Sequence, residues 1–152
     1  MVLRAEGKKV LIADDAPEIV EMLHLVLERR GYQVVGFDNG KKAVEAIPEE
    51  KPDIILLDII MPGMTGLDVC EKVKNDPATK DIPVILITSA TEGTDLDDGF
   101  WNIGTQSDDF LSKPFNPAEL AARVDQLVLG TPLPPEFVKR TRSGAQRVDP
   151  SE

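Results

Sequence analysis

The stretch Asp53-Ile54-Ile55-Leu56-Leu57-Asp58 is a continuous apolar run between two aspartates. Such a run, rich in β-branched side chains and without polar alternation, is typical of a strand that is buried on both faces of a parallel sheet. Two further runs of this kind are Val-Leu-Ile-Ala at residues 10–13 and Val-Ile-Leu-Ile at residues 84–87. We therefore predict that these three segments are central strands of one parallel sheet.

Two weaker strands and five amphipathic segments complete the pattern. The strands are expected at Gln33–Phe37 and Asp109–Ser112. The remaining segments have apolar residues at helical spacing, so we predict that they are helices. One of them begins with Asn116 and Pro117, a typical helix start. Strand and helix alternate five times, so we predict an α/β fold, a doubly wound (βα)5 domain with a five-stranded parallel sheet. The expected stripes are Ile19, Leu23, Val26 and Leu27; Ala43, Val44 and Ile47; Leu67, Cys70 and Val73; Leu96, Phe100 and Ile103; and Leu120, Val124, Leu127 and Val128.

Composition limits the classes of function. The chain has 152 residues, 17 basic against 27 acidic, and a net charge of −10. One domain with a hydrophobic core fits this length, and the acidic balance argues against direct contact with nucleic acid or an anionic membrane. The only cysteine, Cys70, cannot form an internal disulfide, and no secretory signal or membrane-spanning run is visible. We expect a cytoplasmic protein without membrane insertion.

The C-terminal residues differ from the rest of the chain. Residues 131–135 contain three prolines, and residues 136–152 are mostly polar and mildly basic. Too few apolar side chains are present there to form a core. We predict a folded domain at residues 1–130, a flexible tail at residues 131–152, and no attached effector domain.

Polar residues follow the predicted strands where each one ends. In a doubly wound sheet these carboxyl ends share one edge, and ligands bind there. Three carboxylates so close together would repel one another, which favours a hard divalent cation with oxygen ligands, and Mg²⁺ suits such a site. The residues concerned are Asp14 and Asp15 after the first strand, Asp58 after the third, Thr88 after the fourth and Lys113 after the fifth.

This set of groups indicates phosphoryl transfer. A cation, a hydroxyl and an ammonium around a carboxylate form a site for a tetrahedral oxyanion, and one carboxylate must then be the nucleophile. Asp14 and Asp15 lie on the same loop and suit the metal. Asp58 stands alone at the end of the most apolar strand, so we expect it to attack phosphorus.

Four motifs carry a resemblance to a known family: VLIADD at 10–15, DIILLDIIMPGMTGLD at 53–68, IPVILITSA at 82–90 and DDFLSKPF at 108–115. Across residues 8–129 the chain resembles the receiver domain of two-component response regulators, of the single-domain, chemotaxis-regulator-like kind. The resemblance implies a flavodoxin-like strand order 2-1-3-4-5. It also implies that a histidine kinase or phosphotransfer protein phosphorylates Asp58.

The resemblance assigns further roles to single residues. Asp15, Asp58 and the backbone carbonyl of Ile60 would bind Mg²⁺ with help from Asp14, and Thr88 and Lys113 would hold the phosphoryl oxygens. Phe110 would change rotamer together with Thr88, and the Lys113-Pro114 peptide would be cis. The branched Ile60 side chain should also restrict attacking water, so we expect a long-lived phosphorylated state. The protein would be no enzyme beyond its own phosphorylation and autodephosphorylation.

Two other functions remain open at this stage. One is a receiver-fold interaction scaffold that works without phosphorylation. The other is a phosphatase of the haloacid dehalogenase type, which is disfavoured because its second acid lies two residues after the nucleophile of the first strand, where this chain has Ala16. For the receiver we expect a downstream protein partner and a monomer or a phosphorylation-dependent dimer. Cys70 and His24 are interpreted as a buried packing residue and a partly exposed helical residue.

Overall fold

The computed structural model describes residues 5–88 and 107–138. Their order is β1(Lys9–Ala13), α1(Pro17–Glu28), β2(Gln33–Phe37), α2(Gly40–Glu50), β3(Ile54–Asp58), α3(Gly66–Asn75), β4(Val84–Thr88), β5(Asp109–Ser112), α5(Pro117–Leu129) and a 3-10 turn, η1(Pro135–Phe137). All strand pairings are parallel, in the order β2-β1-β3-β4-β5. The predicted fold class and strand order are therefore confirmed. The predicted stripe of Leu96, Phe100 and Ile103 lies outside the described residues.

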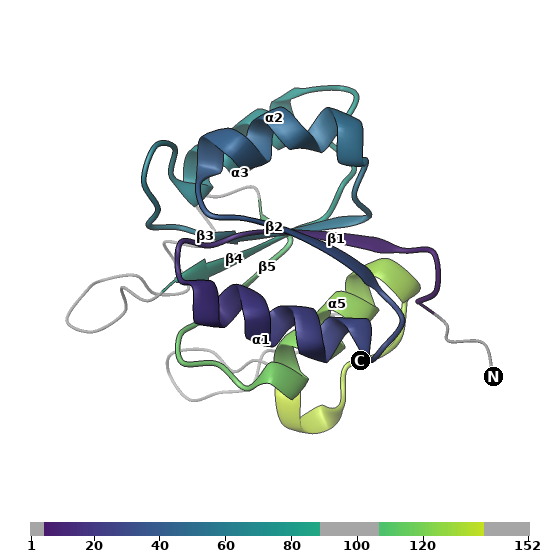
Figure 1. Cartoon of the computed structure of the whole chain (residues 1–152). Helices are drawn as coiled ribbons and strands as arrows, with labels where there is room; N and C mark the ends of the chain where they lie inside the picture. Colours follow the sequence, from purple (N-terminus) through teal and green to yellow (C-terminus); the bar gives the residue numbers. More distant parts are fainter. Residues whose placement is uncertain (1–4, 89–106, 139–152) are drawn as a thin grey trace, which may run out of the picture.

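Helices cover both faces of the sheet (Figure 1). On one face α1 and α5 pack on side chains such as Ile12, Leu56 and Ile85. On the other face α2 and α3 pack on Leu11, Leu57 and their neighbours. Every residue of β3 and β4 is buried, as the continuous apolar runs predict. The core thus consists of two apolar layers separated by the sheet.

Helix ends follow the local sequence signals. The side chain of Asn116 accepts a hydrogen bond from the N–H of Ala118 at 2.8 Å, with Pro117 in the first turn of α5. Thr65 caps α3 in the same way, through the N–H of Asp68 at 3.1 Å. Helix α2 continues to Glu50, two residues past Pro48, although proline cannot donate a hydrogen bond within the helix.

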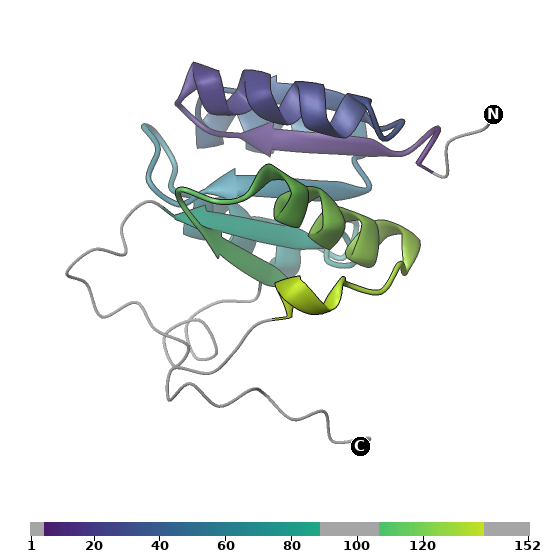
Figure 2. The same ribbon diagram turned by 90° about the horizontal axis from the view of Figure 1, so that it is seen from below.

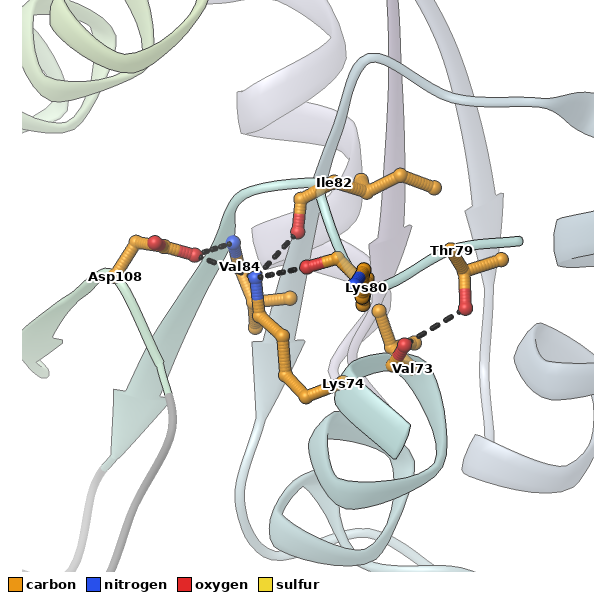
Figure 3. A network of polar contacts seen from close by, with 7 residues as sticks. All are labelled: Val73, Lys74, Thr79, Lys80, Ile82, Val84 and Asp108. Atoms are coloured by element: carbon orange, nitrogen blue, oxygen red, sulfur yellow. Dashed lines mark hydrogen bonds and ion pairs between the residues drawn. The ribbon is translucent and has the colours of Figure 1, made fainter. Parts of the chain in front are cut away.

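A lysine on α3 makes polar contacts near the starts of β4 and β5 (Figure 3). Lys74 Nζ contacts the carbonyl of Ile82 at 2.7 Å, that of Lys80 at 3.2 Å and the carboxylate of Asp108 at 3.0 Å. Asp108 in turn accepts the N–H of Val84 at 2.8 Å. This network joins α3 to the starts of β4 and β5.

The described helices include none with the length and hydrophobicity that a membrane span requires. After α5, Gly130 adopts a left-handed conformation with φ 76°, and the chain continues to Val138 through η1. The domain boundary at residue 130 and the flexibility of residues 131–152 stay predictions. Cys70 is buried and His24 is partly exposed, both as expected.

Candidate functional site

The parallel register brings the predicted site residues to one edge of the sheet. Asp58 ends β3 beside Ile87, and the next residue along β4 is Thr88. Thr88 pairs with Ser112, and its carbonyl accepts the N–H of Lys113 at 2.7 Å. Asp14 follows β1, which is the other neighbour of β3. The ends of four strands therefore bring their polar residues to the same edge of the sheet.

Three carboxylates lie close together at this edge. Asp14, Asp15 and Asp58 each offer an oxygen, and these atoms all lie within 4.8 Å of one another. Asp14 and Asp58 are only 1% and 3% exposed, whereas Asp15 faces solvent. Buried like charges at this separation repel strongly. The site therefore holds an excess of negative charge that a cation would neutralise.

Lys113 supplies part of that neutralisation. Its Nζ lies 3.0 Å from Asp14 Oδ2 and 3.3 Å from Asp58 Oδ2, so one ammonium bridges two carboxylates. The Lys113-Pro114 peptide is cis, as predicted. The amine is thus held over the carboxylates from the loop after β5.

Ionisation at the site reflects this crowding. Burial, and then the charge of Asp14, raise the pKa of Asp58, and Lys113 opposes them only in part. Burial lowers the pKa of Lys113, but the hydrogen bond and charge of Asp14, with those of Asp58, outweigh it and raise that pKa. Lys113 therefore stays protonated, while the charge on Asp58 is costly.

The donor set fits a hard divalent cation. Asp14 Oδ2 is buried, and within the described parts of the chain its polar contact is the Lys113 ammonium at 3.0 Å. The other oxygen, Asp14 Oδ1, accepts the N–H of Ala16 at 2.9 Å. Carboxylate oxygens with solvent access on one side are the ligands that Mg²⁺ takes, because it keeps several waters. Asp14 and Asp15 also line a pocket between α1 and β2 that opens to solvent.

The loop after β3 shapes the site from the other side. Ile60 donates its N–H to Asp58 Oδ1 at 3.4 Å, and its side chain is 56% exposed. Thr88 is fully buried, and Phe110 packs against the α2–α3 layer of the core. The structure thus brings Asp14, Asp15, Asp58 and Lys113 into direct proximity. The roles of Thr88, Ile60 and Phe110 stay predictions.

One positioning residue was missed by the sequence analysis. A β-carbon on Gly66 would lie 2.3 Å from the carbonyl oxygen of Asp58, so only glycine lets α3 begin there. The N–H of Gly66 also donates to the carbonyl of Ile59 at 2.9 Å. A signal was available, because a glycine at the first position of a helix, inside the longest motif, calls for a backbone reason.

Known proteins share this arrangement. The family described as response regulator receiver domain matches residues 10–125. The phosphate regulon transcriptional regulatory protein PhoB of Pseudomonas aeruginosa is 38% identical over 125 residues, which is 82% of this chain and 53% of that protein. The chain thus spans about half the length of this curated relative.

Solved structures of two related proteins have a similar fold. The signal receiver domain of a histidine kinase from Syntrophus aciditrophicus has a TM-score of 0.74 and 36% identity, covering 90% of this chain and 96% of that one. The response regulator TrrA from Thermotoga maritima, solved in complex with Mg²⁺-BeF, has a TM-score of 0.66 and 33% identity, covering 79% and 98%. With its five-stranded parallel sheet and its Asp14, Asp15 and Asp58 cluster, the chain belongs to the response regulator receiver domain family.

Proposed function

We propose that this protein is the phosphoacceptor of a two-component phosphorelay in the cytoplasm. A histidine kinase or phosphotransfer protein would donate a phosphoryl group to Asp58. The phosphorylated domain would then bind a downstream protein partner. The observation that carries the proposal is the placement of Asp58. Its buried carboxylate lies 3.3 Å from the Lys113 ammonium, in a cluster with Asp14 and Asp15.

The chemistry follows from these positions. A carboxylate oxygen of Asp58 attacks phosphorus, a P–O bond to Asp58 forms, and the P–N bond of a phosphohistidine breaks with its electron pair going to the imidazole. Lys113 stays protonated and lies beside the oxygens that gain negative charge. Burial removes competing water and strengthens this interaction.

The acidic cluster is the proposed Mg²⁺ site. Asp14, Asp15 and Asp58 would hold the ion, with the carbonyl of Ile60, and it would neutralise the incoming phosphoryl oxygens. The relative from Thermotoga maritima, solved with Mg²⁺-BeF, supports this choice of ion. Because the carboxylates repel one another without a cation, we expect phosphorylation to require Mg²⁺.

The response to phosphorylation would begin at Thr88 and Phe110. The new phosphoryl group adds negative charge at the ends of β3 and β4, where the Thr88 hydroxyl is expected to turn toward it. Phe110, on the adjacent strand β5, would then change rotamer and alter the surface presented to the partner.

The test uses acetyl phosphate as a small donor. The full chain is incubated with donor and Mg²⁺, and intact mass spectrometry counts the added phosphoryl groups. We expect one group in the parent, none with EDTA, and none in Asp58→Asn. Asp53→Asn, which alters another aspartate at the opposite end of β3, should accept one group as the parent does.

The scaffold function gives a different result. If the parent gains no phosphoryl group although Mg²⁺ binds, Asp58 is not an acceptor for small donors and a purified kinase domain must replace acetyl phosphate. If neither donor adds mass, the proposal fails and the phosphorylation-independent scaffold takes its place.

A further inference from the structure

A buried arginine lies outside the acidic site. Arg123 is on α5 and only 3% exposed. Arginine is rarely that buried unless its guanidinium is paired on several sides. None of the chemistry proposed above uses this residue. The groups that the Arg123 guanidinium contacts therefore indicate the role of this buried charge.

The guanidinium of Arg123 joins three separate parts of the chain. Its Nε donates to Glu119 on the same helix at 3.0 Å, and Nη1 donates to Asp109, the first residue of β5, at 2.8 Å. Its Nη2 donates to the backbone carbonyl of Phe137 at 2.5 Å. The planar fork of arginine holds such partners in defined directions. The third contact fixes a segment that the sequence analysis assigned to a flexible tail.

That segment has local order of its own. The N–H of Phe137 donates to the carbonyl of Pro134 at 2.9 Å, and the N–H of Val138 donates to that of Pro135 at 3.3 Å. The prolines restrict the backbone before docking, which lowers the entropy lost on docking. Leu133, Pro134 and Phe137 are half-buried whereas Pro135 and Glu136 are exposed, so one side of the segment rests on the domain.

The segment lies at the edge of the described sheet. Strand β5 is the last strand in the order, and Figure 2 shows η1 next to its start and next to α5. An uncovered edge strand invites pairing with another chain, and proteins often cover such an edge with a loop. We propose that residues 131–138 form a strap, held by Arg123, that occupies the flank made by β5 and α5 and controls access to it. This inference does not depend on phosphorylation of Asp58.

Hydrogen exchange of the full chain tests whether the strap is docked. In the docked strap the amides of Phe137 and Val138 should exchange more slowly than in a synthetic peptide of residues 131–138, which contains the same donors and acceptors but has no domain to rest on. Equal exchange rates in the chain and the peptide would overturn the proposal.

Arginine modification tests whether the strap controls access. Phenylglyoxal labels accessible guanidinium groups, and peptide mass spectrometry compares Arg123 with the exposed Arg29 in the same molecule. Labelling of Arg123 should be much slower than that of Arg29. The double variant Pro134→Gly/Pro135→Gly favours the undocked strap and should speed labelling of Arg123 roughly fivefold, with Arg29 unchanged.

Pro77→Gly is the matched control, since it removes an exposed proline that is not part of the strap and should leave the Arg123 rate unchanged. Labelling of Arg123 as fast as Arg29 in the parent would show that the strap does not cover it. An unchanged Arg123 rate in the double-glycine variant would show that the domain alone buries Arg123. Either result excludes control of access by the strap.

Discussion

Asp58 bears a charge that the folded domain stabilises poorly. Its pKa is raised by burial and by Asp14, so the folded state binds a proton at Asp58 more readily than the unfolded state does. Above the raised pKa, the charge therefore lowers the free energy of unfolding. The position is suited to binding a cation, because the negative charge of the bare carboxylate is unfavourable beside Asp14.

Asp58→Asn should accordingly stabilise the protein in the absence of Mg²⁺. We expect the free energy of unfolding at neutral pH to rise, because asparagine places no charge beside Asp14 in this buried position. The gain should shrink as pH falls through the raised pKa, since the parent then takes up a proton. Urea titrations at several pH values measure it, and Asp15→Asn, at an exposed carboxylate, should gain less. A stability loss at neutral pH would contradict the interpretation.

We predict that Ile60 affects how long the phosphorylated state lasts. The residue is 56% exposed and its N–H donates to Asp58 Oδ1, so we expect its side chain to hinder approaching water. Ile60→Ala should therefore speed loss of the phosphoryl group severalfold. The decay is followed by intact mass after the donor is removed. Leu25→Ala, at an exposed apolar residue on α1, should decay at the parental rate; equal decay in all three proteins would rule out this role of Ile60.

At the scale of the elements, the start of α3 positions Asp58. Gly66→Ala would place a β-carbon 2.3 Å from the Asp58 carbonyl oxygen and 3.0 Å from Ile59 Cα, and both contacts are backbone. We expect a loss of about 1–3 kcal/mol in stability and slower phosphorylation by acetyl phosphate.

Gly130→Ala is a control that separates the stability loss expected for Gly66→Ala from its expected effect on phosphorylation. Gly130 has open space around it but a φ of 76°, so alanine there costs stability through backbone strain alone. It should leave the phosphorylation rate unchanged. If Gly66→Ala also phosphorylates at the parental rate, α3 does not position the acceptor.

The Lys74 network joins elements at the other end of the sheet. Lys74→Met keeps the apolar stem but removes the contacts to Ile82, Lys80 and Asp108, so we expect a stability loss of about 1 kcal/mol. Lys72→Met, at an exposed lysine on the same helix, should be nearly neutral. Thermal unfolding of the two variants measures the difference, and equal midpoints would assign the network no net stability.

At the scale of the whole molecule, we predict that Mg²⁺ binding is linked to folding. The carboxylates come from the loop after β1 and from the end of β3, and Asp14 is 44 residues before Asp58 in the sequence, so the unfolded chain has no preformed site. At a free Mg²⁺ concentration of about 100 times Kd, the free energy of unfolding should rise by about 2.7 kcal/mol. Calorimetric scans check this, with NaCl at equal ionic strength as the control. Asp58→Asn should gain less, and an unchanged Tm in the parent would exclude the metal site.

Local patterns were sufficient for the sheet and for the polar residues that gather at one of its edges. A buried parallel strand must be apolar on both faces, so the runs at 54–57 and 84–87 and the polar residues after them could be found without coordinates. The bounds predicted for β2 and β5 are those observed. Asp58 could be singled out because strand ends share one edge in this class of fold.

Only the tertiary structure determined how distant groups meet. The bridge of Lys113 between Asp14 and Asp58, and the clamp of Arg123 on Asp109 and Phe137, join residues that no periodicity relates. From the sequence, Arg123 is an ordinary charged residue on an amphipathic helix, and residues 131–138 are a proline-containing tail. The physical reason is that apolar burial is encoded locally by residue type and spacing, whereas pairing of a buried charge depends on side chains that meet only after the elements have packed.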